Sequence, residues 1–214
     1  MKKIVLIGDS IRMGYDKYVK EALSGVAEVY YPAENCRYAE NVLRFAHDWK
    51  KQGEWPTDAD LVHWNAGLWD ALELFGDEPL TSYQYYGEAV ARIHKRLRML
   101  FPNAKIVFAT STAVIEERCS VDFRRHNANI EKFNKTAIDA LADTDAIVND
   151  MFAFTLNCPA ECHSDGVHFN NDKGIALTGG KVISVICKEL DIAPADVNIE
   201  NFEPERYSES NIGY

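Results

Sequence analysis

The sequence predicts an α/β protein whose central sheet is parallel. Five short apolar runs, rich in Val and Ile, alternate with longer segments that carry the helical period. Such runs are typical of strands that are buried on both faces and joined by crossover helices. The predicted strands are residues 3–7, 27–31, 61–64, 106–109 and 146–149.

Helical segments occupy the intervals between these runs, and the first is expected to begin near Tyr15. In three later segments, apolar residues recur every three or four positions and so share one helix face, which we interpret as core packing. These faces comprise Tyr86, Val90, Ile93, Leu97 and Leu100; Ile130, Phe133, Ala137 and Leu141; and Ile175, Thr178, Val182, Val185 and Leu190.

Two connections, residues 69–85 and 115–126, are longer than a minimal crossover needs. Both follow the carboxyl ends of predicted strands, where open parallel sheets bind their ligands, so we expect them to be substrate loops. We expect one catalytic domain over residues 1–190. Residues 191–214 are expected to form an irregular C-terminal extension.

Composition restricts the class of partner. The 214 residues carry 33 acidic against 23 basic side chains, a net charge of −10, without a run of five basic residues. Nucleic acid and anionic membranes are therefore not expected as partners. The apolar stretch after Lys2 and Lys3 is too short for a secretory signal, and no segment is long enough to span a membrane.

The cysteines indicate reduced thiols. Their number, five, is odd, and they are scattered along the chain, so the sequence predicts a cytoplasmic location. Cys158, Cys162 and His163 are conceivable zinc ligands, but the Cys-x-x-x-Cys spacing has no fourth ligand pair at a usual distance. No metal is expected.

Gly8-Asp9-Ser10 directly follows the first predicted strand. A serine at this position can project from the carboxyl edge of the sheet, and its backbone N–H can contribute to an oxyanion hole. Taken alone, the tripeptide is better explained as helix-capping or turn chemistry.

A second motif, Asp165-Gly166-Val167-His168, stands just before the last long helical segment. A serine hydroxyl needs a neutral imidazole to accept its proton, and a carboxylate holds that imidazole in the required tautomer. The separation of three residues lets Asp165 and His168 meet locally. Separately, they are also explained as a turn former and a surface histidine.

The two motifs together resemble the first and last sequence blocks of the GDSL/SGNH hydrolases, and the resemblance spans nearly the whole chain. It implies a flavodoxin-like three-layer α/β/α sandwich, with a central parallel sheet of about five strands. It also implies ester hydrolysis through an acyl-enzyme, without metal or organic cofactor. Ser10 would be the nucleophile, His168 the general base and Asp165 the orienting carboxylate.

The middle blocks of that family are less regular here. The second block usually supplies a glycine N–H to the oxyanion hole, but residues 32–38 contain no glycine, so a backbone N–H between Asn35 and Tyr38 is expected instead. The third block usually reads Gly-x-Asn-Asp. Asn65 is the only asparagine in that region, and we expect its amide to join the Ser10 N–H; alternatively, it closes a strand-end turn.

Substrate contacts are expected near the nucleophile. Arg12 either binds an anionic or hydroxylated substrate or pairs with an acid near the helix start. The aromatic rings around residues 69–86 form either a sugar-stacking platform or local packing anchors. His63 is interpreted as a core histidine. The candidate substrate-binding residues are Asp9, Arg12, Asn35, Arg37 and Trp69, and the aromatic group is Trp69, Tyr83, Tyr85 and Tyr86.

The family resemblance covers carbohydrate deacetylation, lysophospholipid hydrolysis and thioester cleavage. Because the sequence has no long apolar lid segment, we expect a short acyl group, acetyl on a sugar or oligosaccharide. An acyltransferase that uses the same triad and a non-catalytic carbohydrate-binding relative are the alternatives.

Overall fold

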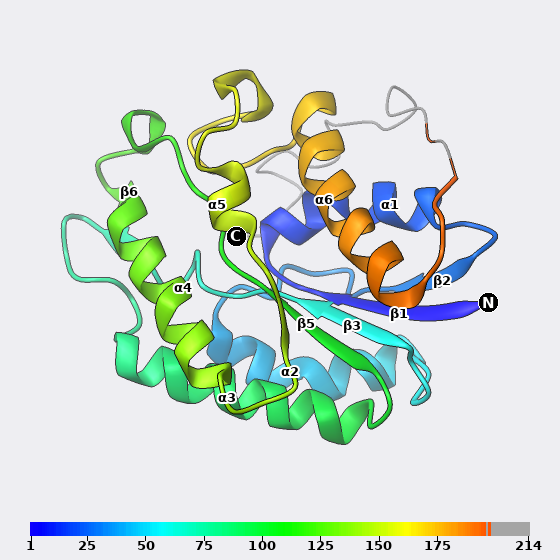
Figure 1. Ribbon diagram of the computed structural model, residues 1–214. Coiled ribbons are helices and arrows are strands. Elements are labelled where there is room, and N and C mark those ends of the chain that lie inside the picture. Colours follow the sequence, from blue (N-terminus) through cyan, green and yellow to red (C-terminus); the bar gives the residue numbers. More distant parts are fainter. Residues whose placement is uncertain (196, 198–214) are drawn as a thin grey trace.

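The protein is a three-layer α/β/α sandwich in the computed structural model, which describes residues 1–195 and 197 (Figure 1). Five parallel strands form the middle layer in the order β2-β1-β3-β5-β7, and this confirms the predicted fold class. The strands are β1 (Lys2–Ile7), β2 (Ala27–Tyr30), β3 (Leu61–Trp64), β5 (Lys105–Ala109) and β7 (Ile147–Asn149).

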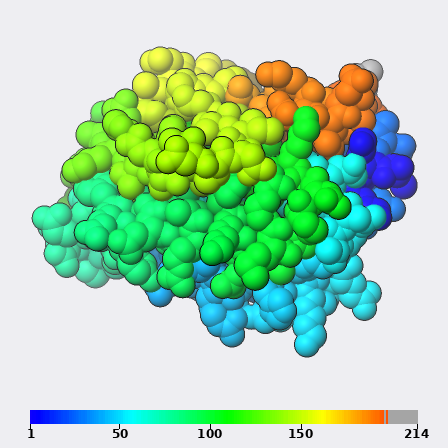
Figure 2. Space-filling view, turned by 60° about the horizontal axis from the view of Figure 1, so that its bottom comes forward, coloured from blue at the N-terminus to red at the C-terminus, as the bar shows by residue number. Residues whose placement is uncertain are grey.

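Helices cover both faces of this sheet. Helix α1 (Ser10–Ala22) packs against α6 (Asp172–Leu190) on one face. On the other face, α3 (Tyr83–Leu100) lies between α2 (Ala39–Gln52) and α4 (Asn127–Leu141). Figure 2 is turned so that this second layer comes forward, and atoms in the teal, green and yellow-green of α3 and α4 extend across the face shown. A short helix, α5 (Met151–Thr155), follows β7.

The start of α1 corrects one sequence-based expectation. The helix begins at Ser10 rather than near Tyr15, because Asp9 caps it: its Oδ1 accepts a hydrogen bond of 3.0 Å from the N–H of Ile11. Ser10 is therefore the first helical residue, directly at the carboxyl end of β1.

The register of the sheet aligns the strand ends that carry the polar motifs. Ile7 pairs with Trp64 across β1 and β3, and the N–H of Asn65 donates to the Ile7 carbonyl at 3.0 Å. The residues that follow β1 and β3 therefore lie side by side, which brings Asn65 next to the Gly8-Asp9-Ser10 turn. All four residues of β3 are buried, as expected for a central strand.

The two long connections meet each other, which the sequence did not predict. Strand β4 (Glu73–Leu74) pairs antiparallel with β6 (Phe123–Arg124) in a separate two-stranded sheet. The N–H of Phe75 extends this pairing by donating to the carbonyl of Asp122 at 3.1 Å. Each connection is thus held in place by the other at the carboxyl edge of the main sheet.

The remaining expectations about the chain have mixed outcomes. All five cysteines are free thiols. Among the described residues, no helix has the length and apolar character needed to cross a bilayer. The division into residues 1–190 and 191–214 stays a prediction, because most of the second segment lies outside the described residues.

His63 lies in the core, as predicted. It is fully buried in β3, and its Nε2 lies 3.1 Å from Nδ2 of Asn149. Burial lowers the pKa of the imidazole to about 4, so the ring is neutral near pH 7.

Candidate active site

Ser10 and His168, 158 positions apart in the sequence, face each other at the carboxyl edge of the sheet. His168 Nε2 lies 2.9 Å from Ser10 Oγ, and His168 Nδ1 lies 2.7 Å from Asp165 Oδ2. Both distances are those of hydrogen bonds. The serine, imidazole and carboxylate form one continuous chain of contacts, which is the arrangement that activates a serine hydroxyl.

A tight turn holds the base and its carboxylate together. Asp165 Oδ1 accepts hydrogen bonds from the N–H groups of Val167 and His168, at 2.6 and 2.7 Å. The N–H of Ser164 donates to the His168 carbonyl at 2.8 Å and closes the turn. The aspartate therefore uses one oxygen to shape its own loop and the other to orient the imidazole.

The charge of Asp165 is stabilised by these contacts. Burial favours the neutral acid, but the His168 side chain and the two backbone N–H groups outweigh it and hold the pKa of Asp165 well below its usual range. The carboxylate is therefore ionised wherever the imidazole is neutral. A hydrogen bond to it favours the tautomer with a proton on Nδ1, so that Nε2 faces Ser10 as an acceptor.

Gly166 fixes the second long connection against this turn. The N–H of Ile115 donates to the Gly166 carbonyl at 2.8 Å. A Cβ at position 166 would lie only 2.9 Å from backbone atoms of Arg118 and Cys119, closer than real Cβ contacts. The glycine thus permits a backbone-to-backbone approach that places the 115–126 connection beside His168.

Asn65, the expected oxyanion-hole donor, lies beside the Gly8-Asp9-Ser10 turn. A Cβ at Gly8 would lie 2.0 Å from Asn65 Oδ1, so the glycine allows the amide to approach the nucleophile turn. Burial raises the pKa of Asp9, and the Asn65 side chain opposes that rise. An amide NH₂ has two N–H groups, so Asn65 can serve Asp9 and a developing oxyanion at once.

In residues 32–38, which correspond to the second sequence block of the family, some backbone N–H groups already donate hydrogen bonds within the protein. The N–H of Cys36 donates to the Gly8 carbonyl at 3.1 Å. The N–H of Arg37 donates to Asn35 Oδ1 at 2.9 Å. These contacts reduce the choice of expected oxyanion donor to the N–H of Asn35 or Tyr38.

Arg12 requires a correction. It is only 1% exposed, and its guanidinium pairs with Asp16 Oδ2 at 2.5 Å. It also donates to the carbonyls of Pro32 and Glu34, at 2.9 and 2.5 Å. Position i+4 on the same helix supplies its acid, so the pairing interpretation is the right one. Arg12 holds the 32–38 segment onto α1 and is not a substrate-binding residue.

The aromatic platform is not assembled either. Tyr86 is fully buried and donates from its hydroxyl to the Ala66 carbonyl at 2.7 Å. Tyr83 packs on Phe133 in the core, with ring centroids 4.5 Å apart. These two rings are packing anchors, while Tyr85 lies on the surface, where its hydroxyl donates to Glu40 at 3.0 Å.

Trp69, by contrast, stays near the site. Its ring packs edge-on against Tyr38 and Phe123, at centroid distances of 5.5 and 6.2 Å. Arg37 lies over the same ring, 6.0 Å from its centroid. Trp69 is only 7% exposed, because it packs between residues 32–38 and the 115–126 connection.

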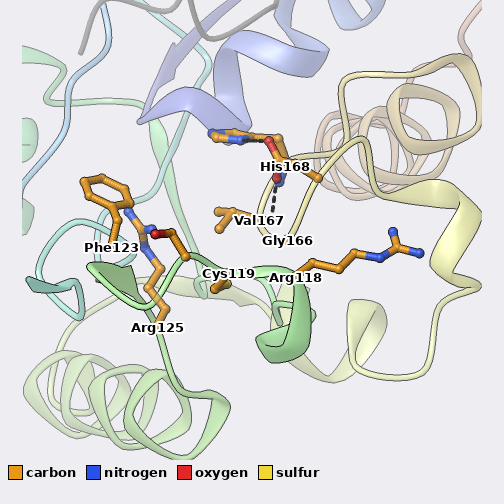
Figure 3. A pocket seen from close by; sticks show the side chains of 9 residues that line it. Arg118, Cys119, Phe123, Arg125, Gly166, Val167 and His168 are labelled. Atoms are coloured by element: carbon orange, nitrogen blue, oxygen red, sulfur yellow. Dashed lines mark hydrogen bonds and ion pairs between the residues drawn. The ribbon is translucent and has the colours of Figure 1, made fainter. Parts of the chain in front are cut away.

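A pocket of about 460 Å³ opens beside His168 (Figure 3). This volume is within the usual range for small-molecule sites. One wall is the turn of residues 165–168 and the other is the 115–126 connection, so this connection lies at the candidate site. The lining residues are Arg118, Cys119, Ser120, Phe123, Arg125, Asp165, Gly166, Val167 and His168.

Most of these lining residues were not anticipated. The length of the 115–126 connection was the only sequence signal for the five residues that it contributes. Which of its side chains face inward depends on the β4–β6 pairing and on the close approach at Gly166. Neither contact can be predicted from the spacing of residues in the sequence.

The conceivable zinc ligands do not form a metal cluster. Cys158 Sγ lies 3.5 Å from His163 Nε2, and the His163 ring packs on Phe169 with centroids 4.1 Å apart. In the part of the chain that the structure describes, no three His, Cys, Asp or Glu side chains are grouped to hold a metal.

Comparison with known proteins finds similar folds among solved structures. No family model and no curated protein sequence matches the chain. Among solved structures, a lipase/acylhydrolase from Enterococcus faecalis is 19% identical with a TM-score of 0.67, covering 92% of this chain and all of that one. The acetyl xylan esterase AlAXEase is 17% identical with a TM-score of 0.64, covering 86% and 99%.

A third structure, provisionally described as an SGNH hydrolase from Slackia heliotrinireducens, is 16% identical with a TM-score of 0.60 and covers 86% and 98%. Over most of its length, the chain therefore has the fold of SGNH-type hydrolases. The predicted resemblance is confirmed at the level of the fold.

Proposed function

We propose that this protein is a serine ester hydrolase of the GDSL/SGNH type. The observation that carries the proposal is the continuous contact from Ser10 Oγ through His168 to Asp165, at the edge of a pocket in a hydrolase fold. A non-catalytic binding protein would not need a hydroxyl, an imidazole and a carboxylate in this order and at these distances.

In this mechanism, Ser10 Oγ attacks the ester carbonyl carbon while His168 Nε2 accepts the hydroxyl proton. The tetrahedral oxyanion accepts hydrogen bonds from the Ser10 N–H and the Asn65 amide. His168 then gives its proton to the leaving alcohol, and an acyl-enzyme remains on Ser10. Water, activated by His168, attacks the acyl carbonyl and releases the acid.

For the substrate we propose a short acyl group, acetyl, carried by a sugar or oligosaccharide. The pocket mixes Phe123 and Val167 with polar side chains, which suits a sugar better than a fatty chain. The fold likeness to an acetyl xylan esterase favours the same choice. Lysophospholipase, thioesterase and acyltransferase activities remain alternatives that use the same triad.

Substrate length provides the test of this proposal. Across p-nitrophenyl esters from acetyl to octanoyl, we expect kcat/KM to be highest for acetyl and at least about tenfold lower for octanoyl, because the sequence has no long apolar segment to cover a fatty acyl chain. A preference for the long esters would favour the lipid alternatives. Product analysis with an added acceptor alcohol separates hydrolysis from acyl transfer.

The value of kcat/KM should fall in a single step as the pH is lowered. Only the neutral imidazole of His168 can accept the Ser10 proton, so we expect activity to be lost in acid. Asp165 adds no second step there, because its pKa is held well below its usual range. We expect activity to fall about tenfold for each pH unit below the midpoint; a rate that is flat down to pH 4 contradicts the mechanism.

A further inference from the structure

The expected oxyanion donors come from two separate connections. Asn65 follows β3, whereas the backbone donor, the N–H of Asn35 or Tyr38, belongs to the segment between β2 and α2. A donor stabilises an oxyanion only when it lies within hydrogen-bond distance of the atom on which the charge develops. The two connections therefore need a fixed spacing, and a residue that joins them contributes to catalysis without touching the substrate.

Asp70 joins these two connections. It lies in the same connection as Asn65 and is only 1% exposed, and its Oδ2 accepts a hydrogen bond of 3.1 Å from the N–H of Ala39. Ala39 is the first residue of α2, and Tyr38, the N-cap residue, makes no capping hydrogen bond with its own side chain. Asp70 therefore caps α2 from a distant part of the chain.

The connection that carries Asn65 and Asp70 is anchored in the core. Ala66, directly after Asn65, is fully buried, and its carbonyl accepts hydrogen bonds from two hydroxyl groups. The Tyr86 hydroxyl donates at 2.7 Å and the Ser111 hydroxyl at 3.3 Å. Because Tyr86 is on α3 and Ser111 follows β5, three parts of the fold hold this connection in place.

The 35–38 segment, by contrast, contains an unfavourable backbone conformation. Arg37 has a φ of +49°, in the left-handed region that residues other than glycine rarely adopt. Asn35 Oδ1 holds the segment by accepting from the Arg37 N–H at 2.9 Å, and Asp70 holds it again at Ala39. Such a conformation persists only where surrounding contacts maintain it. Without Asp70, we expect the segment to relax and to move its N–H groups relative to Asn65.

The contact between Asp70 and α2 does not depend on the charge of the carboxyl group. Burial raises the pKa of Asp70 to about 7, while the Ala39 N–H and the Thr81 side chain oppose that rise. The acid and the carboxylate each keep an oxygen that can accept the Ala39 N–H. An asparagine keeps such an oxygen as well, so Asp70→Asn is the conservative variant.

We propose that Asp70 is a positioning residue, whose bond to the start of α2 sets the spacing between Asn65 and the backbone oxyanion donor of the 35–38 segment. This inference rests on the proposed esterase function and adds to it a residue outside the triad and the oxyanion hole. Because the oxyanion exists only beyond the ground state, loss of the bond lowers kcat and leaves KM nearly unchanged.

The test compares kcat and KM for p-nitrophenyl acetate in the wild type, Asp70→Ala and Asp70→Asn. We expect Asp70→Ala to lower kcat about 10- to 100-fold with KM within about twofold, and Asp70→Asn to keep kcat within about threefold. The Ki of a trifluoromethyl ketone, whose adduct with Ser10 carries an oxyanion, should rise in Asp70→Ala by the factor by which kcat falls. If Asp70→Ala does not fold, Asp70→Ser, whose side chain is too short to reach the Ala39 N–H, provides the same comparison.

Asp60→Ala is the matched control for a general loss of stability. Asp60 Oδ2 accepts a hydrogen bond of 2.8 Å from the Lys3 N–H, which is also a carboxylate-to-backbone bond between distant segments. Lys3 lies near the start of β1, at the edge of the sheet opposite to Ser10, so Asp60→Ala should lower Tm without lowering kcat. The inference is overturned if Asp70→Ala behaves like Asp60→Ala, or if Asp70→Asn loses as much kcat as Asp70→Ala.

A crystal structure of Asp70→Ala separates this inference from the esterase proposal, because it needs no catalysis. We expect the 35–38 segment to be displaced relative to Asn65, while β1 and β3 keep their wild-type positions. An undisplaced segment rejects the positioning role and leaves the esterase in place. A displaced segment in a protein whose wild type cleaves no ester supports the link made by Asp70 and rejects the esterase alone.

Discussion

Replacing Ser10 with alanine is expected to lower kcat for p-nitrophenyl acetate hydrolysis by at least about 10³-fold at pH 7.5. The substitution removes Ser10 Oγ, the atom that lies 2.9 Å from His168 Nε2. Without it no acyl-enzyme forms, and the oxyanion hole can support only weak attack by water. Initial rates of nitrophenolate release from both proteins, at equal concentration, provide the measurement.

Ser184→Ala is the matched control for this prediction. Ser184 lies on the exposed surface of α6, where its hydroxyl donates to the Lys181 carbonyl, so its loss should leave kcat unchanged. Thermal unfolding should give similar Tm values for all three proteins. Equal activity in the wild type and Ser10→Ala, or none in either, would refute the serine mechanism and favour the carbohydrate-binding alternative.

The parts of the site that could be predicted from sequence are those set by short-range rules. Ser10 follows a buried strand, and the carboxyl ends of parallel strands share one edge of the sheet. Asp165 and His168 are close enough in sequence to meet within one turn. Their contacts with each other and with Ser10 therefore required only the fold class, which the strand pattern already indicated.

The parts that could not be predicted depend on contacts between distant segments. Arg12 had two interpretations, and beside its pairing with Asp16 its contacts with the Pro32 and Glu34 carbonyls, far away in sequence, support the structural one. Arg125 faces the pocket because β6 pairs with β4, two strands of two residues each. Strands this short show no detectable alternation of apolar and polar residues. The sequence therefore does not indicate which of their side chains point inward.

Gly8 and Gly166 illustrate the same limit. In the sequence, both are ordinary turn residues inside motifs chosen for their neighbours. In the structure, Gly8 admits the Asn65 side chain, and Gly166 admits the backbone at Arg118 and Cys119. Each glycine marks a close approach to a segment far away in sequence, and spacing alone does not reveal what approaches.

Asp165→Asn is expected to lower kcat by about 10⁴-fold while leaving KM for p-nitrophenyl acetate nearly unchanged. An asparagine can present its NH₂ group to His168 Nδ1, which then becomes the acceptor and places the proton on Nε2. In that tautomer the imidazole cannot accept the Ser10 proton. The kcat and KM values of Asp165→Asn and of Asp139→Asn, an exposed aspartate paired with Lys135, provide the comparison.

The thermal stability of Asp165→Asn provides a second, independent measurement. Because its contacts depress the pKa of Asp165, the ionised carboxylate stabilises the folded state above the pKa of the unfolded chain, about 4, and this contribution is lost as the pH falls. Asp165→Asn should therefore lower Tm modestly at pH 7, with a difference that shrinks below pH 4. A loss of kcat below about tenfold would show that Asp165 shapes the turn without controlling the imidazole tautomer.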